Sequence, residues 1–323
     1  MPAGVPTVRA RIVNCCGFVC AFVSLIAANL AAAEPVKYCR FRAGEKVAYG
    51  LVEGDRVREL TGAFAAWSKT DTTHALADVE LLVPSEPTQV LALAGNYRSH
   101  LGDEDTITTI VTTVVTVKTD RKTGNSETTT TTNEEIRRSG EVPEKFSIPQ
   151  PFFKSPSCLV PQGGEIRIPH DSQVVHYEAE MVIVIGKTAR DVPQDKALDY
   201  VLGVTAGNDV SERVWQRGDV QWWRAKGSDT FGPCGPYIVS GVNYDDLLLE
   251  LRLNGETKQK ERTSHMIHDV ATMVSMISEH VTLHPGDLIF TGTSGTTTTI
   301  KAGDVVEVEL ESVGVLRNPV VAE

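Results

Sequence analysis

Short apolar runs separated by glycines and charged turns dominate the chain after residue 35. Three such runs lie within residues 36–60, and Gly54-Asp55 between the last two predicts a hairpin turn. Val270, Met273, Val274 and Ile277 recur at helical spacing and predict a helix over 268–280. We further expect strands at 178–185, 288–291, 305–310 and 315–321, and short helical segments at 193–201 and 211–217. The pattern therefore predicts an α+β fold that is mainly β.

Residues 106–132 are rich in threonine and other β-branched residues, and they lack proline. This composition favours a two-stranded β-hairpin inserted into the main domain, although a mobile polar loop is the alternative. An exposed apolar ribbon of this kind needs a partner. We therefore expect the hairpin to pack on a second subunit or over the mouth of the active site.

The first 33 residues have the pattern of a secretory signal peptide. Arg9 and Arg11 precede an apolar run over 12–30, and Ala31-Ala32-Ala33 supplies a cleavage site. A single membrane anchor is the alternative. Cleavage would leave a periplasmic or secreted protein with no stable membrane association, whereas a misassigned start would leave a cytoplasmic one. We expect a small β-rich N-terminal domain over 34–87 and a larger domain over 88–323.

The chain is acidic, with 42 acidic and 31 basic residues and a formal charge of −11. This balance argues against a nucleic-acid partner, which requires a lysine and arginine surface. Cys39, Cys158 and Cys234 remain after signal cleavage. Because they are odd in number and scattered, we expect small buried side chains and no disulfide framework.

Paired carboxylates mark the start of an expected strand. His176, Glu178 and Glu180 have the alternate spacing that projects side chains from one face of a strand. Two neighbouring carboxylates on an apolar strand repel each other, and a divalent cation would relieve that repulsion. Oxygen ligands select Mg²⁺, Mn²⁺ or Ca²⁺, and Asp209 is a natural third carboxylate. A solvated strand edge is the alternative.

The carboxylates belong to a series of five motifs that occur in order along the chain. They are His176-Tyr-Glu-Ala-Glu, Gly207-Asn-Asp-Val-Ser-Glu-Arg-Val-Trp-Gln, Lys226-Gly-Ser-Asp-Thr-Phe-Gly-Pro, Leu253-Asn-Gly-Glu and Leu283-His-Pro-Gly-Asp-Leu-Ile-Phe-Thr-Gly-Thr. The series resembles the fumarylacetoacetate hydrolase family, especially its acylpyruvase and hydroxy-heptadienedioate isomerase branch. The resemblance extends from about Leu91 to the end, apart from the threonine-rich insertion. It implies a mixed β-roll with short helices, and homodimers are frequent in the family.

The resemblance also implies roles for individual residues. The ligands of Mg²⁺ or Mn²⁺ would be Glu178, Glu180 and Asp209. The catalytic residues would be Lys226 and His100, with Asp103 or neighbouring Glu104 as the acidic partner of the histidine. The substrate-binding residues would be Arg213, Gln216 and Thr293. The chain departs from the family where the insertion begins directly after Glu104. It departs again at Gly292-Thr-Ser-Gly-Thr, where the family usually has Gly-Thr-Pro-x-Gly.

These residues suit a metal-dependent enzyme acting on a small 2-oxo or 1,3-dioxo acid. A divalent cation stabilises enolate charge, Lys226 adds positive charge, and His100 can activate water. We therefore expect hydrolysis of a C–C bond, as in an acylpyruvase. An isomerase, decarboxylase or hydratase acting on a related dienoate is the alternative. A non-catalytic exported metal-binding scaffold is the alternative from another class.

Overall fold

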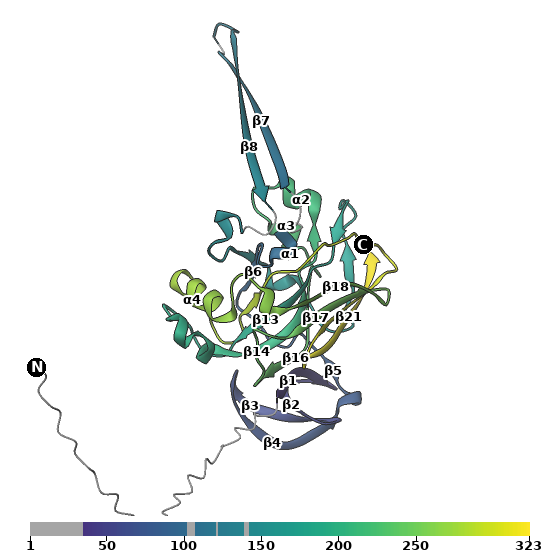
Figure 1. The fold of residues 1–323 in the computed structure, drawn as a ribbon. Coiled ribbons are helices and arrows are strands. Elements are labelled where there is room, and N and C mark those ends of the chain that lie inside the picture. The colour runs from purple at the N-terminus through teal and green to yellow at the C-terminus, as the bar shows by residue number, and fades with distance from the viewer. Residues whose placement is uncertain (1–34, 102–106, 121, 139–141) are drawn as a thin grey trace, which may run out of the picture. The chain divides into compact units, whose positions relative to one another are not determined.

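The protein is built mainly from β-strands, and the computed structural model describes residues 35–101, 107–120, 122–138 and 142–323. The strands are β1 (Val36–Ala43), β2 (Lys46–Glu53), β3 (Arg56–Ala63), β4 (Ala66–Ala75), β5 (Glu80–Leu81), β6 (Val90–Leu93), β7 (Ile107–Thr119), β8 (Ser126–Arg138), β9 (Pro151–Lys154), β10 (Leu159–Val160), β11 (Ile166–Ile168), β12 (Val175–His176), β13 (Ala179–Ile185), β14 (Val201–Asn208), β15 (Ser211–Glu212), β16 (Gly232–Ser240), β17 (Leu248–Leu253), β18 (Glu256–Arg262), β19 (Leu288–Phe290), β20 (Val305–Leu310) and β21 (Gly314–Ala322). The α-helices are α1 (Arg98–Leu101), α2 (Arg213–Gly218), α3 (Trp223–Gly227) and α4 (Val270–His280), and the 3₁₀-helices are η1 (Leu76–Asp78), η2 (Glu144–Phe146), η3 (Pro156–Cys158), η4 (Gln194–Tyr200) and η5 (Thr263–His265). The expected mainly β fold with short helices is confirmed (Figure 1).

One large sheet runs in the order β4-β3-β2-β1-β16-β14-β13-β19-β6-β9, with β5 and β10 paired at its side. The N-terminal strands belong to this sheet, because β1 pairs antiparallel with β16. The turn between β2 and β3 contains Gly54, whose φ of 64° favours glycine. The strand β4 has no counterpart in the sequence-based expectations.

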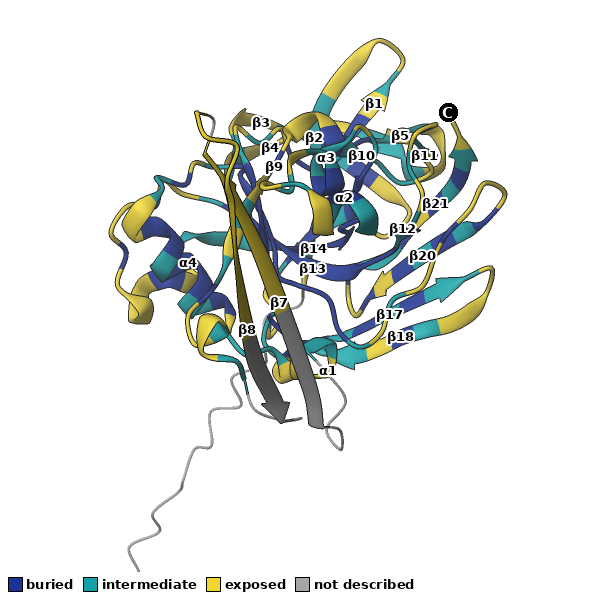
Figure 2. Ribbon diagram, turned by 90° about the horizontal axis from the view of Figure 1, so that it is seen from above, coloured by how far each residue is buried: buried dark blue, intermediate teal, exposed yellow. Residues whose placement is uncertain are grey.

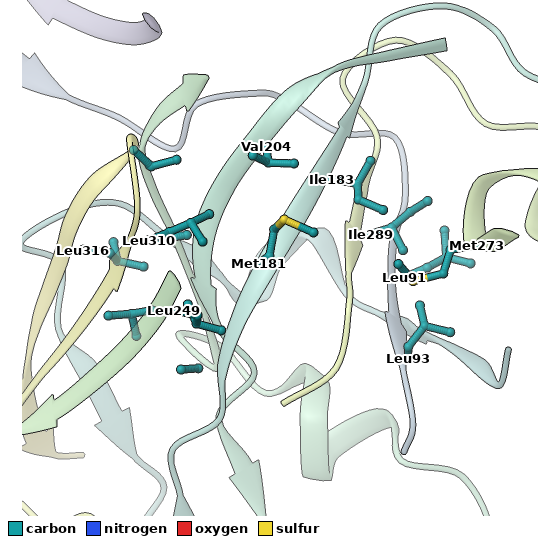
Figure 3. Close-up of a cluster of buried hydrophobic side chains, with 14 of the residues drawn as sticks. Leu91, Leu93, Met181, Ile183, Val204, Leu249, Met273, Ile289, Leu310 and Leu316 are labelled. Atoms are coloured by element: carbon teal, nitrogen blue, oxygen red, sulfur yellow. The ribbon is translucent and has the colours of Figure 1, made fainter. Parts of the chain in front are cut away.

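A second sheet, in the order β11-β21-β20-β17-β18, packs against the large one. Central strand β13 has apolar side chains on both faces, as a strand covered on both sides requires. Met181 and Ile183 belong to the main core, whereas Val182 and Val184 belong to a second buried cluster. Figure 3 shows the main core, with Met181 and Ile183 among side chains from β17, β20 and β21 on one side and from β6, β19 and α4 on the other.

Helix α4 covers part of this core with one face, as its spacing predicted. Val270, Met273, Val274 and Ile277 are buried. The Asp269 side chain caps the helix by accepting a hydrogen bond from the backbone N–H of Thr272 at 2.7 Å. Within the described residues, no helix is long and apolar enough to cross a membrane.

The threonine-rich segment forms a sheet of its own from β7 and β8, which pair from Ile107 with Arg138 to Thr119 with Ser126. Asp120 closes the turn, because its Oδ1 accepts hydrogen bonds from two backbone N–H groups in residues 122–123. The described side chains of the ribbon are exposed (Figure 2), including Val115 at 58% exposure and Val117 at 57%. The paired strands extend beyond the expected limit at residue 132.

Of two further expectations, the structure confirms the one on the cysteines and does not reach the one on the signal peptide. Cys39, Cys158 and Cys234 are buried and free of disulfides, as their scatter predicted. The expected signal peptide over residues 1–33 lies outside the described part of the chain.

Candidate active site

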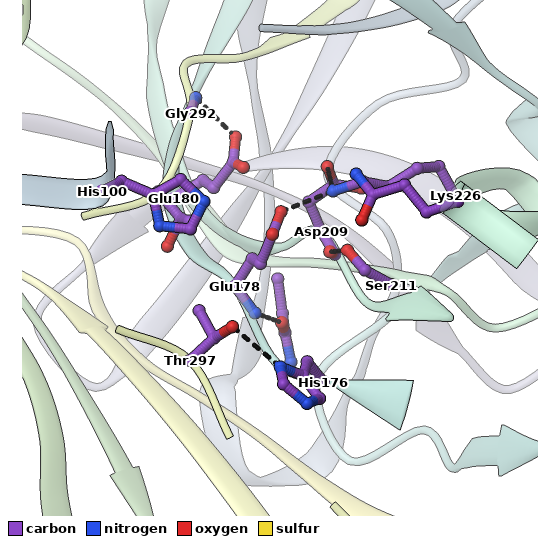
Figure 4. Close-up of polar contacts among 12 residues, drawn as sticks. His100, His176, Glu178, Glu180, Asp209, Ser211, Lys226, Gly292 and Thr297 are labelled. Atoms are coloured by element: carbon purple, nitrogen blue, oxygen red, sulfur yellow. Dashed lines mark hydrogen bonds and ion pairs between the residues drawn. The ribbon is translucent and has the colours of Figure 1, made fainter. Parts of the chain in front are cut away.

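Three carboxylates meet where β13 begins and β14 ends. The antiparallel register pairs Ala179, the first residue of β13, with Asn208, the last residue of β14. Glu178, Glu180 and Asp209 therefore converge, and each offers an oxygen within 4.8 Å of the others (Figure 4). All three are at least 96% buried, with exposures of 4%, 1% and 1%. The predicted carboxylate cluster thus exists as a compact buried group.

The expectation that His176 shares this face is wrong. The strand is interrupted at Tyr177 and Glu178, so His176 belongs to β12, which pairs with β15 instead. Its ring Nδ1 lies 2.9 Å from Thr297 Oγ1, away from the carboxylate cluster. The strand that carries Glu180 begins at residue 179, one position later than expected.

Buried Lys226 and half-buried Arg213 compensate two of the carboxylates. Lys226 Nζ, on α3, lies 2.5 Å from Glu178 Oε2 and 2.6 Å from Asp209 Oδ2. Arg213 Nη2 lies 2.6 Å from Glu178 Oε1. Burial alone would raise the pKa of Glu178, but Lys226 and Arg213 bring it well below the usual value. Glu178 is therefore ionised within this network.

Glu180 has a different environment. Its Oε2 accepts a hydrogen bond from the backbone N–H of Gly292 at 2.7 Å, and the φ of 95° at that residue favours glycine. Its buried Oε1 has no partner among the described residues. Burial raises the pKa of Glu180 well above its usual value, and the charges of Asp209 and Glu178 raise it further.

The donor set therefore fits a divalent cation. Three converging carboxylates offer hard oxygen ligands. The Glu180 Oε1 atom also finds, within the part of the chain that the structure describes, no hydrogen bond of the kind that a buried polar atom normally makes. Glu178, Glu180 and Asp209 are the residues that would hold the ion. The same oxygen donors suit Mg²⁺ and Mn²⁺ alike.

Lys154 is a site residue that the sequence analysis missed. It ends β9 with a fully buried side chain, and its Nζ lies 2.5 Å from Asp209 Oδ1. It also donates to the backbone oxygens of Lys226 and Phe231. Burial opposes its charged form, yet the Asp209 carboxylate raises the pKa of Lys154. The only sequence signal for Lys154 as a site residue was its position directly after the aromatic residues Phe152 and Phe153.

His100 lies on α1 beside the carboxylates (Figure 4). Its Nδ1 lies 2.7 Å from the backbone oxygen of Gly295. A carbonyl oxygen can only accept, so Nδ1 donates its N–H to Gly295, and Nε2 is the ring nitrogen that is left to act as a base. Ser99 Oγ accepts a hydrogen bond from the Gly295 N–H, which ties α1 to the same loop. The expected acidic partners, Asp103 and Glu104, lie outside the described residues.

A cavity of about 240 Å³ opens onto this cluster. His100, Glu178 and Lys226 line it together with Gln216 and Thr293. Among the predicted substrate-binding residues, Gln216 accepts a hydrogen bond from Arg213 Nη1 at 2.9 Å, and Arg213 itself contacts Glu178. The structure therefore brings the three predicted substrate-binding residues to the edge of one site.

Gln259, on β18, fixes the loop that carries Thr293, and the sequence analysis did not identify it. Its Nε2 donates to Thr293 Oγ1 at 2.8 Å and to the backbone oxygen of Ser294 at 2.5 Å. Its Oε1 accepts from the backbone N–H of Ala179. One buried amide therefore joins the start of β13 to the Thr293 loop.

The sequence model described as "Fumarylacetoacetate (FAA) hydrolase C-terminal" matches residues 125–321, which include the carboxylates and Lys226. The chain belongs to the fumarylacetoacetate hydrolase family. A second model, "Rv2993c-like, N-terminal", matches residues 36–84. The relationship that the ordered motifs indicated is confirmed, and the chain is a member of an enzyme family.

The names of the relatives do not all give the same reaction. Protein Rv2993c of Mycobacterium tuberculosis is 36% identical over 293 residues, covering 87% of this chain and 97% of the relative. The crystal structure of 2-hydroxyhepta-2,4-diene-1,7-dioate isomerase from Mycobacterium marinum matches with a TM-score of 0.72 and 35% identity, covering 89% of this chain and 99% of that chain. Oxaloacetate tautomerase fahd2 of Xenopus laevis is 38% identical over 182 residues, covering 53% of this chain and 57% of the relative.

Proposed function

We propose that this protein is a divalent-metal-dependent hydrolase that cleaves a C–C bond in a 2-oxo or 1,3-dioxo acid of the acylpyruvate type. The observation that carries the proposal is the buried Glu180 Oε1, which has no hydrogen-bond partner in the described ranges and lies with two more carboxylates beside Lys226 and His100. These groups supply a cation site, a positive charge and a base around one cavity.

Charge favours an anionic substrate. Glu178, Glu180 and Asp209 are formally balanced by Lys154, Lys226 and Arg213. A bound divalent cation would therefore leave an excess of positive charge in a buried site. A 2-oxo acid brings a carboxylate and a keto oxygen that offset this charge, and such pairing is strong where water is excluded.

The chain's own residues have separable tasks in the reaction. A divalent cation supplies Lewis-acid stabilisation of the enolate charge that develops. Lys226 Nζ adds a second positive charge at the same place. His100 Nε2 takes a proton from water, whose oxygen bonds to the acyl carbonyl carbon. The bond from that carbon to C3 of the pyruvate unit then breaks, C3 takes up a proton, and a carboxylic acid and pyruvate leave.

The names of the relatives favour a second candidate function. An isomerase at 35% identity and a tautomerase at 38% identity indicate that the same site can move a proton without breaking a C–C bond. In that case His100 would exchange a proton with the substrate carbon rather than with water. A decarboxylase would need the same enolate stabilisation.

Pyruvate release from acetylpyruvate tests the proposal, and the ultraviolet absorbance of the enol of oxaloacetate reports tautomerisation, which releases no pyruvate. The full chain is stripped with EDTA, reloaded with Mn²⁺ or Mg²⁺, and incubated with each of the two compounds in turn. We expect metal-dependent pyruvate release from acetylpyruvate, lost in Glu180→Gln and kept in Glu279→Gln, an exposed position on α4. Tautomerisation of oxaloacetate without acetylpyruvate cleavage would favour the second candidate, and no conversion of either would refute both.

A further inference from the structure

The side-chain amide of Gln259 has a defined orientation. Its Oε1 accepts a hydrogen bond from the backbone N–H of Ala179 at 3.1 Å, and its Nε2 donates to the backbone oxygen of Ser294 at 2.5 Å. A backbone N–H can only donate and a backbone oxygen can only accept, so a flipped amide would lose both bonds. The NH₂ group of Gln259 therefore faces the loop that carries Thr293.

This orientation determines how the Thr293 hydroxyl can bond. Gln259 Nε2 also lies 2.8 Å from Thr293 Oγ1. Because the NH₂ group of an amide only donates, the threonine oxygen accepts this bond and its own O–H remains to be donated. Thr293 is only 3% exposed and lines the reaction cavity, and within the described ranges no acceptor for its O–H lies at hydrogen-bond distance. The buried hydroxyl is thus a donor that awaits an acceptor.

The strand β18 is irregular at Gln259. In its pairing with β17, Leu251 lies opposite Gln259, whereas the next residue, Arg252, lies opposite Thr257, so the register shifts between them. A bulge of this kind re-aims side chains and is frequent beside active sites. Although β18 ends the second sheet, the Gln259 side chain is only 5% exposed, and both ends of its amide have partners. Backbone and hydrogen bonds together therefore hold Gln259 against the Thr293 loop.

We propose that Gln259 is a positioning residue that fixes the Thr293 hydroxyl as a hydrogen-bond donor to the substrate. The proposal rests on the proposed function, because a 2-oxo acid is the ligand that brings acceptor oxygens into the cavity beside Thr293. A hydroxyl that is already oriented loses little freedom when the ligand binds, and its bond to a charged oxygen is stronger than a bond between neutral groups. Gln259 is not among the described residues that line the cavity, so it acts through Thr293.

Exchange of the amide for a carboxyl group tests the direction of this bond. Gln259→Glu keeps the shape of the side chain and the oxygen that accepts from Ala179, but the ionised carboxylate offers an acceptor to the Thr293 hydroxyl in place of a donor. The Mn²⁺-loaded full chain is titrated by calorimetry with oxalate, which offers the carboxylate and oxo oxygens of a 2-oxo acid and has no acyl group to be cleaved. We expect Gln259→Glu to weaken oxalate binding about tenfold or more.

A double-mutant cycle separates this role from a merely structural one. Thr293→Val removes the hydroxyl, so Gln259→Glu should cost about fivefold less oxalate affinity in that background than in the native one. Thr293→Ser keeps a hydroxyl and should keep the full effect. The control Gln194→Glu makes the same exchange at an exposed glutamine that donates to Thr272 Oγ1 at 2.8 Å, and it should leave oxalate binding unchanged. An equal loss in the native and Thr293→Val backgrounds would overturn the inference.

Metal binding and turnover decide the remaining outcomes. Unchanged Mn²⁺ affinity shows that a variant is folded, and Gln259→Met, which cannot donate, replaces Gln259→Glu in the cycle if the latter binds no Mn²⁺. Loss of Mn²⁺ binding in both variants, or a native protein that binds no oxalate, would overturn the inference.

Turnover separates the inference from the proposed function. With acetylpyruvate, Gln259→Glu should raise KM and change kcat little, because the bond to Thr293 is present before the reaction begins. The expected coupling in oxalate binding, found in a native protein that releases no pyruvate from acetylpyruvate, would uphold the inference and overturn the proposed hydrolysis. Pyruvate release without that coupling would overturn the inference alone.

Discussion

Replacing Lys154 with methionine tests the buried charge network. Methionine keeps most of the side-chain volume but cannot donate a hydrogen bond. Asp209 Oδ1 would lose its partner at 2.5 Å, and the backbone oxygens of Lys226 and Phe231 would lose theirs. Asp209 would retain Lys226 Nζ at 2.6 Å as a cationic partner.

The size of the effect follows from this geometry. Removing one partner of a buried ion pair costs about 3–5 kcal/mol, because the remaining charge stays buried. For a chain of this length that loss lowers the melting temperature by roughly 10 °C. We therefore expect Lys154→Met to be much less stable than the native protein in EDTA.

Thermal unfolding in EDTA, monitored by circular dichroism, measures the loss. Lys187→Met, at an exposed position after β13, is the control and should change stability by less than about 0.5 kcal/mol. A double-mutant cycle with Asp209→Asn should give a coupling of about 1–3 kcal/mol. A Lys154→Met protein that melts with the native one, or a coupling near zero, would refute the reasoning.

Three further predictions concern separate parts of the chain. His100→Ala should lower hydrolysis about 10²–10⁴-fold, and calorimetry should find its Mn²⁺ affinity unchanged; activity within a few-fold of native would remove His100 as the base. Glu59 is buried and bonded to Lys46 at 2.5 Å, and this contact lowers the pKa of Glu59 from 4.5. Glu59→Gln should therefore cost about 1–2 kcal/mol in urea unfolding at pH 7, and the difference should vanish as pH falls below 4.5 through the lowered folded pKa; an equal difference at pH 3 would contradict this. The exposed valines within residues 107–138 favour a contact between subunits. Replacement of this segment with a short linker should therefore reduce the mass of the assembly in light scattering, and an unchanged mass would exclude the segment as a subunit contact.

The sequence predicted those parts of the structure that depend on local pattern. The apolar spacing of α4 and the run of β13 each follow from neighbouring residues, and both elements formed with small changes at their ends. The sequence also pointed to Glu178, Glu180 and Asp209 as one group, and the structure brings them together because antiparallel β13 and β14 place the end of one strand beside the start of the other. Prediction of Lys226 and Arg213 as members of the same site required the ordered motifs as well.

Long-range partners were not predictable in the same way. Lys154 lies 55 positions from Asp209, and no spacing rule connects them. Gly295 orients His100 through a backbone oxygen 195 positions away, and a backbone group has no sequence signature. His176 was misplaced because alternation assumes an unbroken strand, whereas the ladder changes partner between β12 and β13. These features depend on tertiary packing, which local spacing does not specify.

Titration of Mn²⁺ into the EDTA-stripped full chain tests the central claim most directly. Calorimetry on the native protein should find one ion per chain. Glu180→Gln keeps the shape of the side chain but removes a charged ligand, and it should weaken binding by at least about 100-fold. A native protein that binds no Mn²⁺, or a Glu180→Gln protein that binds it as tightly as the native one, would contradict the assignment of the three carboxylates as a metal site.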